Sequence, residues 1–592
     1  MVGPETPANR GGTRMTEKEA LRRQIDAAAG RTKADLVVKN CRIVNVFSGE
    51  IESGEIAVLD GVIVGTEAGF EGRGTVDAEG RFAAPGFIDA HTHIESSFLS
   101  PEQAGRMLVP RGTATIVADP HEIANVCGLD GVRYMMEAAK GTKLSILFAM
   151  PSCVPATPFE DAGAKLDAAD MEELLADRRI FGLGEFMNTP GVFRADDAVL
   201  DKLTLARRAG KIVDGHAPAL SGRELNAYAC AGILGDHECR TAEEIRARIA
   251  KGMYAMLREG SACHDLRNLL AGVTEASSRR ALFCSDDCQP KTILTEGHID
   301  RHLRICVEEG FDPVTAVRMA TLNAAEAFRL CDRGAIAPGR RADIVLLDDL
   351  KDFHVHRVFL GGELVAEEGR YLPELSLADV SAVRGSVKVR DFSADRLKVK
   401  LKGNRARVIG LQKNSIVTTK EIVTVQTDGG GDFVFAPARD VCKLAVVERH
   451  RGTGRVGVGL LGGYGIKAGA VAVSVAHDSH NLIVAGVSNE EMAFAVETLI
   501  AMEGGMAVVK DGKVLASMPL PIAGLMTTES AEWVAERLDA IHEKAQTELG
   551  VSPDMEPIML LTFMALPVIP ALKLTARGLF DSELFDFVPL EA

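Results

Sequence analysis

The alternation of apolar strand-like segments with amphipathic helical segments between Phe82 and Asp332 constrains the fold of this chain more than any other feature. Eight apolar segments occur there, and stretches such as DGVRYMMEAAK and TAEEIRARIAK between them carry apolar residues at helical spacing. Eight strands alternating with helices over about 250 residues predict a (β/α)8 TIM-type barrel. A doubly wound parallel sheet is the alternative, because counting strands does not distinguish the two.

The remaining segments predict further domains of an α/β protein. Short strands separated by turns occupy residues 35–81, and the same pattern returns over 333–375. We therefore expect a small β-sandwich domain built from both flanks, with the 82–332 barrel inserted in it. Residues 1–34 form an N-terminal extension, which we expect to be disordered over 1–14, and residues 376–592 form a separate α+β domain.

Composition excludes several classes of function. A formal net charge of −16 disfavours binding to nucleic acid or to an anionic membrane surface. No run of about 18 apolar residues predicts a membrane-spanning helix, and the N-terminus lacks the apolar core of a secretory signal. The 11 cysteines are odd in number and scattered, as in reduced proteins, so we expect a cytoplasmic location.

Ionisable residues follow the apolar segments at the points where the strands should end. His91 and His93 lie two apart after the first segment, so both imidazoles share one face of the strand. Later segments end in further ionisable residues, namely Glu185, His216, His237 and Asp286 or Asp287. A charged group at the end of a buried strand is costly unless it is paired or binds a metal. Imidazoles and carboxylates together suit a divalent transition metal.

The motifs around these residues carry a family resemblance. GFIDAHTHIESS, ADPHEIANVCG, GLGEFMN, DGHAPALSG, DHE, LREGSA and FCSDD resemble the amidohydrolase superfamily. The late motifs SVAHDSHNLIVAG, MEGGMAVVKDGKV and ALPVIPALKLT are similar to those of the bacterial adenine deaminases within it. The resemblance covers about residues 35–590. It implies hydrolytic deamination of adenine to hypoxanthine and ammonia, as part of purine salvage, by a metal-activated hydroxide that attacks C6.

The resemblance also implies a ligand set for two divalent metal ions per subunit. Mn²⁺ is the first choice, with Fe²⁺ or Zn²⁺ as alternatives. The implied ligands are His91, His93, Glu185, His216, His237 and Asp286. Glu185 would bridge the two ions, and Asp286 would also accept the proton of the attacking water and pass it to the departing amine.

One element of related deaminases is missing. Many deaminases with a single metal show His-x-x-Glu after the fifth strand, and the Glu protonates the substrate ring. Here Ala219 occupies the position of that Glu, three residues after His216. The ring proton must come from elsewhere, and Glu95, His121 and Glu122 are the candidates, with Glu95 and His121 preferred. The candidate substrate-binding residues are Asp119, Glu122, Asn125, Ser96, Ser97 and Asn188, and a helix cap or turn is an equally good role for each.

A second polar cluster spans residues 477–481, with the sequence HDSHN after an apolar strand. We interpret it as a polar turn, with a contribution to a site across a domain or subunit interface as the alternative. The expected partner is a small purine, and we expect a homo-oligomer, a dimer in the first instance. The alternative function is that of another amidohydrolase, acting on a cyclic amide or a related nucleobase. A non-catalytic barrel protein is the further alternative, against which the intact ligand set argues.

Overall fold

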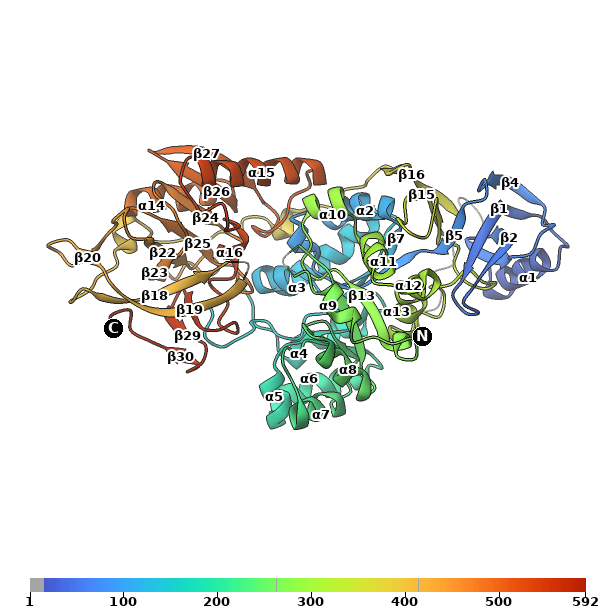
Figure 1. Cartoon of the computed structure of the whole chain (residues 1–592), viewed down its shortest axis with the longest axis horizontal. Helices are drawn as coiled ribbons and strands as arrows, with labels where there is room; N and C mark the ends of the chain where they lie inside the picture. The colour runs from blue at the N-terminus through green and yellow to red at the C-terminus, as the bar shows by residue number, and fades with distance from the viewer. Residues whose placement is uncertain (1–14, 262, 414) are drawn as a thin grey trace.

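The computed structural model describes residues 15–261, 263–413 and 415–592. The disorder expected for residues 1–14 therefore lies outside the described residues. Three regions follow one another along the longest axis in Figure 1: a β-rich region near the N-terminus (blue), a central α/β region (cyan to green) and a C-terminal α+β region (orange to red). No helix of these described residues is both long and apolar enough to cross a lipid bilayer.

The β-rich region is one nine-stranded sheet that both flanks of the central region build, in the order β17-β16-β15-β14-β5-β1-β2-β3, with β4 paired to β1. Its strands are β1 (Ala34–Asn45), β2 (Glu50–Leu59), β3 (Val62–Gly65), β4 (Gly72–Asp77), β5 (Phe82–Pro85), β14 (Ile344–Leu347), β15 (Val355–Leu360), β16 (Glu363–Glu367) and β17 (Arg370–Tyr371). Ile56 and Ile344 from opposite flanks share one buried cluster. The sequence-distant flanks therefore fold as one unit, and helix α1 (Glu17–Ala28) packs Ala27 beside Val64 of β3.

The central region contains two parallel sheets, one of five strands in the order β10-β9-β8-β7-β6 and one of three in the order β11-β12-β13. The strands are β6 (Phe87–Thr92), β7 (Thr113–Ala118), β8 (Ser145–Met150), β9 (Ile180–Phe186), β10 (Ile212–Gly215), β11 (Gly235–Asp236), β12 (Tyr254–Arg258) and β13 (Ala281–Cys284). Backbone hydrogen bonds link the sheets at both seams. Leu234 N–H donates to Val213 O at 2.8 Å, and Asp286 N–H donates to His91 O at 2.9 Å.

Helices follow most of these strands, as the alternation in the sequence predicts, and give the central region its TIM-type α/β character. They are α2 (Pro101–Leu108), α3 (His121–Ala138), α4 (Ala168–Ala176), α5 (Thr189–Arg194), α6 (Asp197–Arg208), α7 (Gly222–Cys230), α8 (Ala242–Ala250), α9 (Leu266–Leu270), α10 (Pro290–Glu296), α11 (Ile299–Glu308), α12 (Pro313–Met319) and α13 (Leu322–Ala327).

The first apolar segment of the central region differs from its prediction as one strand. It forms two strands: β5 pairs with β14 in the nine-stranded sheet, and β6 pairs with β7 in the parallel sheet. Gly86 lies between them, and its N–H donates to Asp343 O at 2.9 Å. A Cβ at Gly86 would lie 2.4 Å from the Ala114 side chain, so glycine allows the close approach at which the chain passes from one sheet to the other.

The C-terminal region is built on an eight-stranded sheet in the order β19-β18-β23-β22-β25-β24-β26-β27. Its strands are β18 (Arg405–Gln412), β19 (Ser415–Thr424), β22 (Val441–Val447), β23 (Val456–Gly462), β24 (Ala470–Val473), β25 (Leu482–Gly486), β26 (Gly505–Lys510) and β27 (Lys513–Pro519), and its helices are α14 (Asn489–Ala501), α15 (Ala531–Thr547) and α16 (Met559–Thr562). Smaller sheets add β20 (Gln426–Thr427), β21 (Phe433–Val434), β28 (Leu572–Thr575), β29 (Gly578–Asp581) and β30 (Asp586–Phe587).

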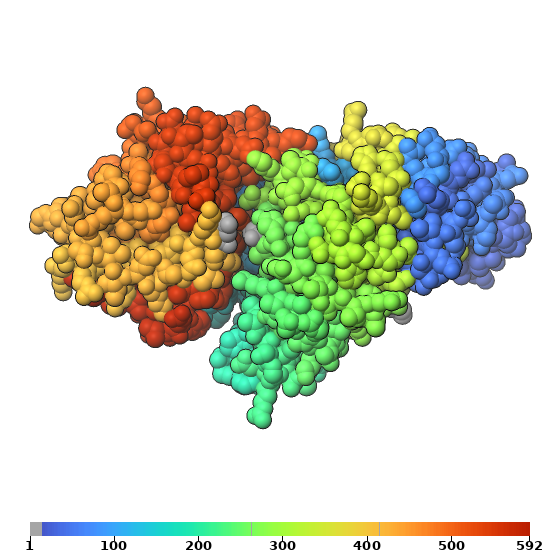
Figure 2. Space-filling view, in the orientation of Figure 1, coloured from blue at the N-terminus to red at the C-terminus, as the bar shows by residue number. Residues whose placement is uncertain are grey.

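The C-terminal region docks on the central region, and Figure 2 shows the two packed side by side, with the N-terminal sheet at the opposite end of the molecule. Thr527 exchanges backbone hydrogen bonds with the segment after β6: its N–H donates to Phe98 O at 2.8 Å, and its carbonyl accepts from Ser100 N–H at 2.9 Å. Asp161 accepts from Arg577 Nη2 at 2.8 Å and from Arg455 Nη1 at 2.9 Å. These contacts place the C-terminal region beside the carboxyl ends of the parallel strands.

Candidate metal centre and adjoining pocket

The two histidines of the first motif meet at the carboxyl end of β6. His91 is the fifth residue of β6 and His93 follows the strand directly, and both side chains are buried. Their Nε2 atoms lie 3.1 Å apart. The expectation that both imidazoles face one point is therefore met in the geometry of the chain.

The outer nitrogens of these two rings are held by hydrogen-bond acceptors. His91 Nδ1 lies 3.0 Å from Asp214 Oδ2, and His93 Nδ1 lies 2.9 Å from the Asp119 carbonyl oxygen. Both Nδ1 atoms therefore carry the proton, and the two Nε2 lone pairs face each other. Two lone pairs aimed at one point fit a cation between them, and an acceptor on the far nitrogen is the usual second partner of a metal-binding histidine.

Glu185, at the end of β9, lies between four imidazoles. Its Oε1 is 3.1 Å from His121 Nδ1 and 3.6 Å from His93 Nε2. Its Oε2 is 2.7 Å from His216 Nδ1 and 3.2 Å from His237 Nε2. Burial acts to raise the pKa of Glu185, but the neighbouring imidazoles, His216 first, hold that pKa well below its usual value. A carboxylate with each oxygen facing a different pair of imidazoles is suited to bridge two ions.

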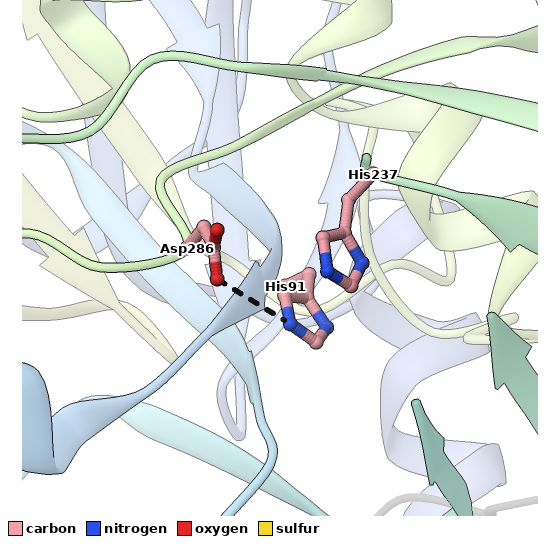
Figure 3. A group of neighbouring side chains, drawn as sticks. All are labelled: His91, His237 and Asp286. Atoms are coloured by element: carbon pink, nitrogen blue, oxygen red, sulfur yellow. Dashed lines mark ion pairs between the residues drawn. The ribbon is translucent and has the colours of Figure 1, made fainter. Parts of the chain in front are cut away.

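Asp286, two residues after the end of β13, completes the cluster. Its Oδ1 lies 3.2 Å from His93 Nε2 and 3.8 Å from His91 Nε2, the ion pair marked in Figure 3. Its Oδ2 accepts from Arg258 Nη1 at 2.9 Å. Although burial acts to raise the pKa of Asp286, the hydrogen bond with His93 and the charge of Arg258 hold it well below the usual value. Asp286 is therefore an ionised base beside the imidazoles.

The rings of His91 and His237 stack face to face in Figure 3, with centroids 3.9 Å apart. The Nδ1 atom of His237 is buried and has no hydrogen-bond partner within the part of the chain that the structure describes. Ligand atoms of the six predicted metal ligands fall in overlapping groups within 4.8 Å, including His91–His237–Asp286, His91–His93–Glu185 and Glu185–His216–His237. The donor set of buried imidazoles and carboxylates fits a divalent transition metal.

The candidate substrate-binding residues fall into two groups by position. Ser96 and Glu122 line a pocket beside the cluster. The others make local or supporting contacts: Ser97 Oγ donates to Ile94 O at 2.6 Å, Asn188 Oδ1 accepts from Gly191 N–H at 3.0 Å and so caps α5, and Asn125 Nδ2 donates to His121 O at 3.0 Å. The substrate-binding role of all these residues stays a prediction.

Asp119 supports the cluster instead of facing the pocket. Its Oδ2 accepts from the Glu185 N–H at 2.8 Å, and its carbonyl oxygen holds His93 as described above. Asp214 and Arg258 have matching supporting positions, on His91 and on Asp286, and sequence reasoning missed both. Asp214 lies on β10, two residues before His216, which directly follows the strand, so strand alternation could have placed both on one face.

The pocket beside the cluster has walls from two regions of the chain. The central region contributes Glu95, Ser96, Glu122, Ser261, Asp287 and Gln289. The C-terminal region contributes Val475, His477, His480, Leu525, Ile558 and Phe563. Sequence reasoning missed the apolar residues of the second wall. Phe563 lies in an apolar stretch, where the sequence signal is that of a core residue, so nothing marked it as pocket-lining.

Two carboxyl groups on the central wall differ in their proton affinity. Burial, followed by the nearby charge of Glu122, raises the pKa of Glu95 to about 7. The Glu95 Oε2 atom is buried without a hydrogen-bond partner in the described residues. Burial acts to raise the pKa of Glu122 as well, but His477 and His480 hold it well below the usual value. Of the proton-donor candidates, Glu95 is thus the carboxyl group that carries a proton near neutral pH.

The HDSHN cluster does more than form a turn. It connects β24 to β25, and its two histidines reach across to α3 of the central region. His477 Nδ1 lies 2.6 Å from Glu122 Oε1, and His480 Nε2 contacts Glu122 Oε2. The alternative interpretation, in which this segment contributes to a site across an interface, describes the geometry better than a solvated turn.

Comparisons with known proteins agree with this architecture. The amidohydrolase family model matches residues 82–365, and the model of the adenine deaminase C-terminal domain matches residues 415–586. The chain is 56% identical to adenine deaminase 2 of Desulfotalea psychrophila, over 97% of this chain and 100% of that protein. It is 50% identical to adenine deaminase of Ligilactobacillus salivarius, over 97% of this chain and 100% of that protein.

Parallel strands that end in a cluster of imidazoles and carboxylates, together with the match to the amidohydrolase model, define a metal-dependent hydrolase. The near-complete overlap with curated relatives and the matching C-terminal domain narrow this class further. The chain belongs to the adenine deaminase family. The resemblance found in its motifs is confirmed.

Proposed function

We propose that this chain catalyses the hydrolytic deamination of adenine to hypoxanthine and ammonia, a reaction of purine salvage. The observation that carries the proposal is the pairing of a histidine–carboxylate cluster with a pocket closed by the adenine deaminase C-terminal domain. A metal cluster alone is common to many amidohydrolases. The second wall, which comes from a domain specific to this family, supports a purine as the substrate.

We propose two divalent ions in the cluster, with Mn²⁺ as the first choice and Fe²⁺ or Zn²⁺ as alternatives. Divalent ions at such a site supply an acidified water near neutral pH. The residues that would hold them are His91, His93, Glu185, His216, His237 and Asp286. Glu185 is the natural bridge, since each of its oxygens faces different imidazoles.

Asp286 is the proposed base. Its low pKa keeps it ionised, Arg258 orients its carboxylate, and its Oδ1 faces the imidazoles where the water must lie. It accepts the proton of the attacking water and passes it to the amino group that leaves C6 as ammonia. Glu95 is the proposed donor to the ring nitrogen N1, next to C6, because its unpartnered Oε2 lies beside the pocket and the ring needs a proton as electron density moves into it.

His121 and the remaining candidates have supporting roles in the proposal. His121 lies between Glu185 and Glu122, 3.1 Å and 3.5 Å from their oxygens, so it connects the cluster to the pocket wall. Ser96 contacts Asp287 and orients it at the pocket. The other residues predicted to bind the substrate are Asp119, Asn125, Ser97 and Asn188, and that role stays a prediction.

The expectations about domain architecture, location and oligomeric state remain part of the proposal. Seam hydrogen bonds support a closed (β/α)8 barrel over residues 82–332, inserted in a β-sandwich domain of residues 35–81 and 333–375, with a C-terminal domain over 376–592. The 11 free cysteines support a reducing, cytoplasmic location. A homo-oligomer, a dimer in the first instance, stays a prediction that light scattering of the purified protein tests.

The experiment that tests the function gives purified, metal-analysed protein adenine, adenosine, guanine and a dihydropyrimidine in parallel, and measures ammonia release from the three purines and ring opening of the dihydropyrimidine. We expect rapid release from adenine, loss of that release after chelation and recovery with Mn²⁺. Ring opening of the cyclic amide, or ammonia release from guanine instead of adenine, would establish the alternative amidohydrolase activity. No turnover of any of the four by protein with two bound ions would refute the proposal.

A further inference from the structure

Glu122 is the meeting point of two distant parts of the chain. It lies in the first turn of α3, and its two oxygens face His477 Nδ1, at 2.6 Å, and His480 Nε2, 355 and 358 residues away along the chain. All three side chains are buried. A buried carboxylate between two imidazoles admits two interpretations, a third metal site or a hydrogen-bonded assembly that holds one of the rings for use.

The backbone distinguishes these interpretations. The Ala476 N–H donates to His480 Nδ1 at 3.1 Å, so that nitrogen carries the lone pair. The proton of the neutral ring is then on Nε2, the atom that contacts Glu122 Oε2. A metal at His480 Nε2 would need lone pairs on both ring nitrogens, so the geometry favours the hydrogen-bonded assembly.

The same logic leaves one nitrogen of His477 free. Its Nδ1–H donates to Glu122 Oε1, and no hydrogen bond engages its Nε2 among the residues that the structure describes. His477 lines the same pocket as Glu95, and Phe563 stacks on the His477 ring with centroids 4.6 Å apart and an interplanar angle of 17°. The His477 N–H also donates to Thr562 O at 2.9 Å. Ring and backbone are thus fixed, and one polar atom is left for a ligand.

We propose that His477 Nε2 is a hydrogen-bond partner of adenine at a ring nitrogen remote from C6, so that the C-terminal domain reads the purine directly. This inference rests on the proposed function. N1 adjoins C6, which must approach the histidine–carboxylate cluster, so N3, N7 and N9 are the nitrogens left for the other wall. Glu122 is a positioning residue for His477, because its Oε1 accepts from His477 Nδ1 and so sets the orientation of that ring, and His480 contacts the other oxygen of Glu122.

The test deletes one nitrogen on each side of the contact. In His477→Asn the amide nitrogen replaces Nδ1 and keeps the partner for Glu122, but nothing replaces Nε2. In His477→Gln the longer side chain places its amide near the position of Nε2. Wild type and variants are assayed as metal-loaded full-length enzymes with adenine, 3-deazaadenine, 7-deazaadenine and 9-deazaadenine. His542→Asn, the same change at a half-exposed histidine of α15 outside the pocket, is the matched control.

We expect His477→Asn to lower kcat/KM for adenine roughly 10- to 100-fold, the usual loss when a buried hydrogen-bond partner is removed. For one deaza analogue, the kcat/KM of the wild type should be lower than for adenine by a similar factor. With His477→Asn, the same analogue and adenine should have equal kcat/KM, because the two deletions remove the same contact. His477→Gln should fall between wild type and Asn, and His542→Asn should match wild type. Metal content should stay at the wild-type value in all of them.

Three results would overturn the inference. The first is a kcat/KM of His477→Asn for adenine within about threefold of the wild-type value, and the second is an equal loss of kcat/KM in His477→Asn on adenine and on all three analogues. The third is a third metal equivalent in the wild-type enzyme that the Asn variant lacks. The last result would assign the cluster to a metal instead. Failure of the proposed function is distinguishable, because the wild-type enzyme itself would then release no ammonia from adenine. A failed inference leaves wild-type turnover intact.

Discussion

His91 and His93 show how single residues prepare a metal centre. In each ring Nδ1 is hydrogen-bonded to a protein acceptor, which is Asp214 Oδ2 for His91 and the Asp119 carbonyl for His93. The Nε2 atom of each ring points at the cluster. The tautomer is therefore set before any ion arrives, and less rotational freedom is lost on binding. Glu185 and Asp286 supply negative charge that would neutralise divalent ions at this point.

The replacement Asp286→Asn tests the proposed base. Asparagine keeps the shape of the side chain but cannot accept the water proton, so we expect kcat to fall roughly 10²- to 10⁴-fold. Ammonia release and metal content are measured on the same preparations. Asp539→Asn, at an exposed partner of Lys291, is the control. Turnover within a few-fold of wild type at full metal content would exclude Asp286 as the base.

The sequence predicted the candidate ligands better than their supports. A charged residue at the end of a buried strand is costly unless it is paired or binds a metal, so its position alone indicates a functional role. The candidate ligands in such positions are His91, His93, Glu185, His216, His237 and Asp286. Supporting groups give a weaker signal, because their partners lie far along the chain. Asp214 and His91 are 123 residues apart, and only the folded chain pairs them.

At the scale of elements, the packing of β9 against the segment after β7 holds Glu185 in place. Gly184 allows the contact: a Cβ there would lie 2.1 Å from Asp119 Oδ2, the atom that accepts the Glu185 N–H. The segment after β7 and the end of β9, which lie on either side of β8 in the sheet, thus approach at a point where no side chain fits.

We therefore expect Gly184→Ala to displace Asp119 and with it Glu185. Metal affinity should fall roughly 10- to 100-fold, as for the loss of other supporting contacts at metal sites, while the overall fold persists. Competition against a chelator measures the affinity, and circular dichroism checks the fold. Gly74→Ala is the control, because the nearest atom there lies at 3.5 Å, an ordinary contact. Unchanged affinity in Gly184→Ala would mean that Asp119 does not support the cluster.

A second element-scale prediction concerns β28, which buries a lysine. Burial lowers the pKa of Lys573 to about 7, and its Nζ donates to Ile416 O at 2.9 Å. An unfolded lysine titrates near pH 10.4, so between about pH 7 and pH 10 the unfolded chain binds more protons and the free energy of unfolding rises with pH. Below pH 7 both states are protonated and this rise is absent.

The replacement Lys573→Met removes this dependence. We expect the Met variant to be more stable than wild type at pH 6 to 7, by on the order of a few kcal/mol, with the difference shrinking as pH approaches 10. Denaturant unfolding at a series of pH values measures it, and the exposed Lys402→Met is the control. If the difference in free energy of unfolding between the Met variant and wild type does not change with pH, then burial does not lower the pKa of Lys573 in the folded state.

The elements themselves were largely predictable, because the alternation of apolar and helical segments repeats over the whole central region. Their grouping into sheets was harder to predict. Residues 82–93 have one continuous apolar character, yet β5 and β6 join different sheets. The choice depends on Asp343, more than 250 residues later, which receives the N–H of Gly86 between the two strands. Local sequence does not contain that contact.

At the scale of the whole molecule, the pocket depends on how firmly two regions stay together. The Asp161 carboxylate of the central region accepts from Arg577 and Arg455 of the C-terminal region, and the Asp161 carbonyl accepts at 2.8 Å from Nδ2 of Asn481, the last residue of the HDSHN cluster. The two arginines are partly exposed, so each ion pair contributes modestly and is screened by salt.

The replacement Asp161→Ala should loosen this docking by roughly 1 kcal/mol, since paired contacts to one carboxylate are lost. We expect amide exchange over residues 475–481 to speed up roughly fivefold, and KM for adenine to rise while kcat holds. Hydrogen exchange with mass spectrometry and steady-state kinetics measure the two effects. Asp554→Ala, at a surface pair with Lys413 inside the C-terminal region, is the control. Exchange equal to wild type over this segment would contradict the docking role.

The division of the pocket between regions has a consequence for synthesis. Every candidate ligand lies between His91 and Asp286, whereas the opposite wall ends at Phe563. A ribosome needs on the order of 15 to 55 seconds to add the roughly 280 residues in between. A growing polypeptide thus completes its candidate ligand set well before it can enclose a nucleobase.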